Sequence, residues 1–131
     1  MFLPPALVVH GLVHTQAALR PGLPVTLLSA PGAAIFAGCG WWRALMLAAG
    51  AEHHVLDCAD APGRAMEALR LGQQVLVFDG ASPAFAAVSA AAAVQGALVL
   101  PARPIALDLA HPDAPRRLIA WLQGDNGCVL G

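Results

Sequence analysis

The chain is organised around residues 55–63, which read Val55-Leu56-Asp57-Cys58-Ala59-Asp60-Ala61-Pro62-Gly63. A short apolar run stops there at an acidic turn, and a helix-like segment begins. This pattern predicts a buried strand whose carboxyl end runs directly into a helix. In open α/β sheets, ligands bind at the edge formed by the carboxyl ends of the strands. Asp57 and Asp60 are therefore the first candidate site residues.

The same alternation of apolar runs and helical segments continues on both sides of this stretch. Strands are expected at 6–10, 24–29, 53–57, 74–79 and 97–100, and helices at 12–20, 41–49, 64–71, 82–95 and 115–122. Connections this short favour local, right-handed crossovers between parallel strands. The pattern predicts one α/β domain over residues 1–131, a three-layer sandwich with a mostly parallel five-stranded sheet and helices on both faces. A flavodoxin-like or Rossmann-like sheet is the first choice, and a half-barrel with strands in sequence order is the alternative.

Some segments have two interpretations. Residues 6–10 form either a strand or part of a helix over 5–19, and β-branched Val8-Val9 followed by Gly11 favours the strand. Residues 103–110 are either an edge strand or a packed loop. The helix at 41–49 has an alternative start near Ala33. Asp113 is expected to cap the last helix, which should bury Leu118, Ile119, Trp121 and Leu122, and residues from about 124 to 131 should form a loose tail.

Composition predicts self-association. Hydrophobic residues make up 58% of the 131 residues and charged residues only 11%, against about 25% in ordinary soluble domains. These few charged residues are too few to cover the surface of a monomer. Part of the apolar surface is therefore expected to lie against a second copy of the chain. The uncharged spans 1–19, 21–42 and 81–102 have the length of bilayer helices, but proline, glycine, histidine, serine and glutamine residues interrupt them. No membrane association is expected.

Net charge and cysteine content bear on nucleic-acid binding and on the cellular location. A net charge of -1 without any basic run argues against nucleic-acid binding. The three cysteines, Cys39, Cys58 and Cys128, are widely spaced and form no Cys-x-x-Cys motif. They predict reduced thiols and a cytoplasmic location.

Missing residue types exclude several chemistries. The chain contains no lysine, which rules out Schiff-base catalysis and a Walker-type phosphate loop, and no tyrosine, which rules out Tyr-Lys dehydrogenase chemistry. Ser29 stands at a predicted strand end, yet it lacks the Gly-x-Ser-x-Gly context of a hydrolase nucleophile.

Five polar residues follow predicted strand ends and should share one edge of the sheet: His10, Ser29, Asp57, Asp60 and Asp79. In one interpretation the carboxylates hold Mg²⁺ or a ligand's hydroxyl groups, with His10 as an acid or base. In the other, Asp60 caps a helix while Asp57 and Asp79 bind backbone amides in turns. No residue is assigned as catalytic.

Three further motifs favour structural roles. Residues 38–43, Gly-Cys-Gly-Trp-Trp-Arg, resemble a phosphate-binding turn only in part, and a flexible turn followed by core tryptophans is favoured. Cys58 should be a small buried residue whose thiol pKa is raised by the neighbouring carboxylates. His10 and His14 have a zinc-chelating spacing but lack an acidic partner, so no metal site is expected and no cofactor is assigned.

These features favour a self-associating binding or scaffold module, with a small anionic or nucleotide-like ligand at the carboxyl edge of the sheet. The alternative is a metal-assisted enzyme that uses the strand-end aspartates together with His10.

Overall fold

A computed structural model describes residues 3–124 of the chain. Its centre is one parallel sheet of six short strands: β1 (Ala6–Val8), β2 (Thr26–Leu28), β3 (His54–Asp57), β4 (Val75–Val77), β5 (Leu98–Leu100) and β6 (Ala106–Asp108). The order across the sheet is β5-β4-β3-β2-β1-β6. The predicted α/β class with a parallel sheet is confirmed, and residues 6–8 form a strand, not part of a helix.

Six helices follow or connect the strands: α1 (Leu12–Leu19), α2 (Ala33–Phe36), α3 (Cys39–Ala49), α4 (Pro62–Arg70), α5 (Phe85–Val94) and α6 (Ala114–Leu122). The helix expected at 41–49 does begin earlier, but as two pieces. Gly38 separates α2 from α3 with a φ of 99°, a left-handed conformation that glycine adopts without strain. The sixth strand, β6, resolves the ambiguous segment 103–110 as an edge strand paired with β1.

Alternate strand residues face two different environments. On one face, a core cluster joins strand residues such as Leu7, Leu27 and Leu76 to buried residues from all six helices. On the other face, Val8, Leu28, Val55 and Val77 form a second cluster, and the half-buried residues packed against them come from strands or from the segment before β1. The helices therefore pack on one face, as in the half-barrel alternative. Strands β1 to β5 follow one another across the sheet, and crossovers of one hand that advance in one direction place their helices on the same side.

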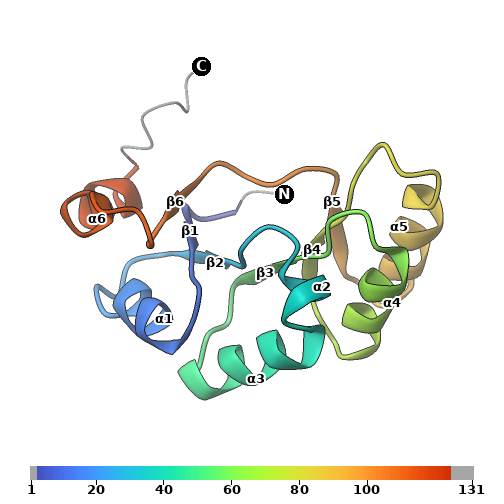
Figure 1. Cartoon of the computed structure of the whole chain (residues 1–131), viewed down its shortest axis with the longest axis horizontal. Coiled ribbons are helices and arrows are strands. Elements are labelled where there is room, and N and C mark those ends of the chain that lie inside the picture. Colours follow the sequence, from blue (N-terminus) through green and yellow to red (C-terminus); the bar gives the residue numbers. More distant parts are fainter. Residues whose placement is uncertain (1–2, 125–131) are drawn as a thin grey trace.

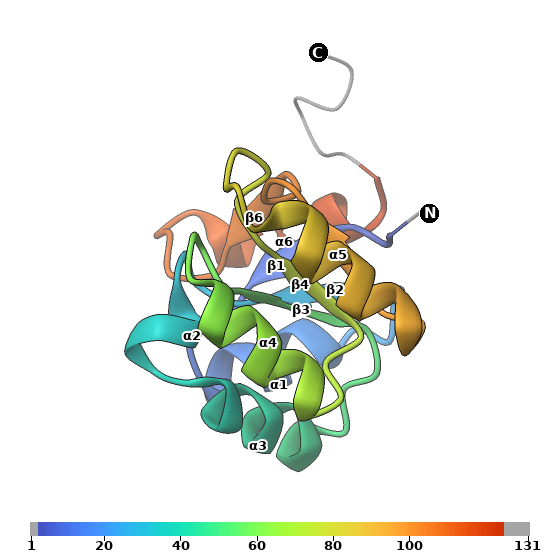
Figure 2. The same ribbon diagram turned by 90° about the vertical axis from the view of Figure 1, so that its right-hand side faces the viewer.

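The second face is covered by extended chain. Figure 1 shows the strands as an arc with the helices outside it, and the connection from β5 to β6 spanning the open side of the arc. Figure 2 shows α3 and α4 below the sheet and the β5–β6 connection above it. Leu3, in the segment before β1, packs against the second cluster from outside the sheet, beside the strand residues Leu100 and Ala106. The molecule thus has three layers, namely helices, sheet and covering chain.

Helix starts depart from the pattern-based boundaries at three positions. The helix expected from Ser82-Pro83 begins at Phe85, and Ser82 instead accepts a bond from the Ala84 amide (3.1 Å) within a preceding turn. Asp113 stands before α6 but binds Arg116 (2.8 Å) and makes no capping bond. Ala61, not Asp60, is the N-cap residue of α4, where proline at the first helical position needs no amide partner.

Gly80 lets the chain that leaves β5 pass close to the end of β4. Its amide donates a hydrogen bond to the Pro101 carbonyl (3.0 Å). A Cβ atom at Gly80 would lie 2.7 Å from the Pro101 Cβ and 3.5 Å from its backbone. Since both chains are held by hydrogen bonds, only glycine permits this approach.

We expect Gly80→Ala to lower the free energy of unfolding by about 1–3 kcal/mol, because the new methyl group displaces Pro101. Urea denaturation followed by circular dichroism measures this. Gly63→Ala is the matched control, since Gly63 lies in α4 with nothing within 4 Å of its Cβ position. It should raise stability by up to about 1 kcal/mol. Equal effects of the two substitutions would contradict the close approach.

Candidate functional site

An open cleft of about 460 Å³ lies at the carboxyl ends of β2 to β5. Its lining comes from the turns after these strands: Pro31, Gly32, Asp57, Ala59, Asp60, Val77, Asp79, Ala102 and Arg103. This is the edge at which a parallel sheet exposes its strand ends. The structure therefore brings together three of the five predicted site residues, namely Asp57, Asp60 and Asp79.

Asp57 is held rigidly at the floor of the cleft. It is the last residue of β3, and only 4% of its side chain is exposed. One carboxylate oxygen accepts the Ala59 amide at 2.7 Å, and the other forms an ion pair with Arg103 at 2.6 Å. Both oxygens are thus engaged, so Asp57 orients Arg103 and is a poor candidate for a metal ligand.

Asp79 and Asp60 are exposed at the wall of the cleft. Asp79 accepts the amide of Ala81 at 2.9 Å with one oxygen, which leaves the other oxygen for a ligand. The Asp60 carboxylate makes no hydrogen bond to any residue of 3–124, so the predicted capping role is wrong for this side chain. These two carboxylates are the available acceptors of the site.

Ser29 is placed next to Asp57 but faces inward. It is fully buried, its hydroxyl oxygen accepts the Asp57 amide at 2.9 Å, and its hydroxyl donates to the Ala30 carbonyl at 3.1 Å. The side chain therefore joins β2 to β3 beyond the last ladder bond. It is not among the residues that line the cleft.

His10 follows β1 at the same sheet edge and does not line the cleft. Its Nε2 lies 2.7 Å from a carboxylate oxygen of Asp108, the last residue of β6. Burial works against ionisation of Asp108, but the Ala110 amide and His10 outweigh it and hold the pKa of Asp108 below its usual value. The His10–Asp108 pair is a separate feature that joins the ends of β1 and β6.

Asp57, Asp79 and Asp108 share one local geometry. Each accepts the backbone amide two residues further on, at 2.7 to 2.9 Å. Such turns satisfy an amide that leaves the strand ladder. The interpretation of Asp57 and Asp79 as turn residues is therefore correct, and it coexists with their position in the cleft.

Arg103 is the residue of the cleft that pattern reasoning missed. It stands three residues after β5, in the segment that could be either strand or loop. The rule that selected the aspartates, a polar residue just after a predicted strand, applies equally to Arg103. Without the position of the crossing segment, however, nothing in the sequence pairs it with Asp57.

The Cys58 thiol and the His54 imidazole near the sheet have structural roles. Burial, with additional effects from Cys39, Asp57 and Glu67, raises the pKa of Cys58 to about 12, as expected for an inert buried thiol. His54 accepts hydrogen bonds at Nδ1 from Trp42 (3.2 Å) and lies 3.1 Å from the Gln73 amide nitrogen. Burial lowers the pKa of His54. Within residues 3–124, no three His, Cys, Asp or Glu side chains are grouped so that they could hold a metal ion.

The fold and the cleft define a small parallel α/β domain with a polar site at the carboxyl edge of its sheet. Comparison of the chain with protein-family models, curated proteins and solved structures found no match. In the part of the chain that the structure describes, no helix has the length and apolar character needed to cross a bilayer.

Arg103→Gln should lower the free energy of unfolding by about 1.5–3 kcal/mol, because the buried Asp57 carboxylate loses its charged partner. Chemical denaturation at neutral pH measures the change. Arg116→Gln is the control: its ion pair with Asp113 is also short (2.8 Å), but the two side chains are 76% and 50% exposed. That substitution should cost at most about 0.5 kcal/mol. A similar loss in both variants would show that burial of Asp57 does not strengthen its pair.

Proposed function

We propose that this protein is a binding module that holds a small polar ligand in the cleft formed by Asp57, Asp60, Asp79 and Arg103. The observation that carries the proposal is the gathering of charge. The whole chain has only eight acidic and seven basic residues, yet three carboxylates and one guanidinium line this single cleft. A concave site at the strand ends that holds a small number of polar groups is typical of a binding pocket.

The charges favour a nucleoside-like or sugar-like ligand over a simple anion. Asp60 and Asp79 have free carboxylate oxygens, which accept hydrogen bonds from hydroxyl groups. A phosphate would instead meet three carboxylates against one arginine that is already paired. Of the two ligand kinds expected from the sequence, anionic and nucleotide-like, the ribose hydroxyls of the second fit this lining better.

The alternative of a metal-assisted enzyme receives less support. It requires His10 and the strand-end aspartates in one pocket, whereas His10 pairs with Asp108 and both Asp57 oxygens are occupied. We therefore propose ligand binding without assigning a reaction.

Titration calorimetry with adenosine, ribose and inorganic phosphate tests the ligand class. We expect adenosine and ribose to bind and phosphate not to, because hydroxyl groups donate to the carboxylates. Asp60→Asn combined with Asp79→Asn should weaken adenosine binding about tenfold or more, as expected when charge-assisted hydrogen bonds are lost.

Asp113→Asn is the control for this experiment, since Asp113 is a partly exposed carboxylate just before α6 and outside the cleft. It should leave adenosine binding unchanged. Binding of phosphate as tight as that of adenosine, or equal weakening by Asp113→Asn, would refute the assignment.

We further propose that the protein forms a homodimer in the cytoplasm through an apolar helix face. This face consists of exposed large side chains on α1, α2 and α3: Leu12, Ile35, Phe36, Trp41 and Leu47. Phe36 and Leu47 are 70% and 67% exposed, and the only Lys, Arg, Asp or Glu residue in these three helices is Arg43. Helix α3 contacts both α1 and α2, and exposed apolar side chains gathered on neighbouring helices mark association sites. The buried, unpaired Cys39 and Cys58 agree with a reducing compartment.

Light scattering at micromolar concentration should report a dimer. Phe36→Glu combined with Leu47→Glu should shift the protein to monomer, because the new charges would have to be buried in the interface. Val94→Glu is the control, since Val94 on α5 is 89% exposed and lies outside the apolar helix face. A monomeric unmodified protein, or an equal effect of Val94→Glu, would contradict the proposal.

A further inference from the structure

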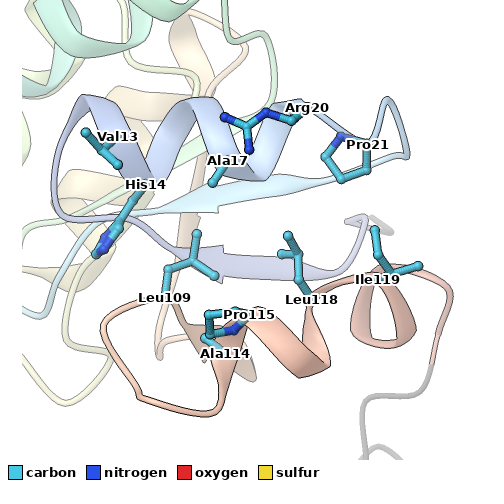
Figure 3. Close-up of a pocket in the computed structure, with 10 residues that line it drawn as sticks. All are labelled: Val13, His14, Ala17, Arg20, Pro21, Leu109, Ala114, Pro115, Leu118 and Ile119. Atoms are coloured by element: carbon cyan, nitrogen blue, oxygen red, sulfur yellow. The ribbon is translucent and has the colours of Figure 1, made fainter.

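A second cavity, of about 510 Å³, lies between α1 and α6 on the helical side of the sheet. Figure 3 shows Leu109 and Leu118 pointing into the space below α1, with His14 at one end. Ala17 lines the α1 side of this α1–α6 groove. The groove is separate from the cleft at the strand ends, and the two share no lining residue.

The groove stays open because small residues stand where the two helices face each other. Ala17 on α1 and Ala114 on α6 both line it and do not fill the gap. Ile119, expected to be buried, is 46% exposed here, and Leu118 is only half-buried. Among residues 3–124, no side chain covers this apolar wall. Most known small-molecule sites have a volume in this range.

The charge of the groove is positive. Its titratable lining residues are Arg20 and His14, and the described residues that line it include no carboxylate. Arg20 forms no ion pair with any residue of 3–124. In Figure 3 its side chain turns back along α1 toward Ala17. The nearby Asp108 carboxylate is already paired with His10, so the unmatched charge lies at Arg20.

We propose that the α1–α6 groove binds a small organic anion with an apolar body, such as a medium-chain carboxylate. The anionic head pairs with Arg20, and the body lies against Leu109 and Leu118. From Val13 to Arg20 the helix rises by roughly 10 Å, which matches a chain of moderate length. Guanidinium groups bind carboxylates through charge-assisted, bidentate hydrogen bonds. This site does not depend on the ligand proposed for the cleft.

Titration calorimetry with octanoate, 1-octanol and octylamine separates the role of the head from that of the body. Octanoate should bind about tenfold more tightly than octanol, and octylamine should bind least, because only octanoate pairs with Arg20. Arg20→Gln should bring octanoate to the level of octanol, whereas Arg70→Gln on α4, outside the groove, should change nothing.

Ala17→Phe fills the groove and should abolish binding of both octanoate and octanol. Ala90→Phe is its control, because Ala90 is exposed on α5 outside the groove. Circular dichroism verifies that each variant is folded. Independently of any variant, octanoate should shift the methyl resonances of Val13, Leu109 and Leu118 in NMR spectra of the unmodified protein.

Equal affinity for octanoate and octanol would reveal a general apolar surface and overturn the proposal. Absence of binding by every probe, or octanoate shifts confined to methyl groups outside the groove, would overturn it as well. Adenosine binding at the cleft is measured separately, so failure of one site leaves the other testable.

Discussion

The ion pair between Arg103 and Asp57 ties the chain that leaves β5 to the middle of the sheet. Without this contact at 2.6 Å, the connection from β5 to β6 would have no charged anchor as it crosses the second face. The same segment supplies Pro101, which packs against Gly80. Residues 101–103 therefore both begin the segment that covers the second face of the sheet and complete the lining of the cleft.

The cleft and the groove differ in the charges that line them. Carboxylates gather at the strand-end cleft, whereas the α1–α6 groove has only an arginine and a histidine. The remaining outer surface of α2 and α3 is almost uncharged. Three surfaces with different chemistry thus arise on a domain whose sheet is built from strands of three or four residues.

Local sequence signals were sufficient to predict the strands and most helices. Apolar runs such as 74–79 and breaks at glycine or proline indicated the elements correctly, because both effects act over a few residues. The strand order and the pairing of β6 with β1 depend on contacts across the whole chain, and a three-residue strand such as Ala106–Asp108 has too little pattern to distinguish it from a loop. For the site, Asp57, Asp60 and Asp79 were found by their position after strands. Arg103 was missed because its partner is 46 residues away.

The position of β6 sets the order in which the sheet can be completed during synthesis. Strands β2 to β5 each pair with the strand before them, so these pairs can form as the ribosome releases successive units. The outer edge of β1 is closed only by β6, and the Trp121 indole then bonds the Ala6 carbonyl across 115 residues. The first strand made is therefore the last to gain both neighbours. Until then its unpaired edge is open to other chains, so residues 106–124 protect β1 against intermolecular pairing.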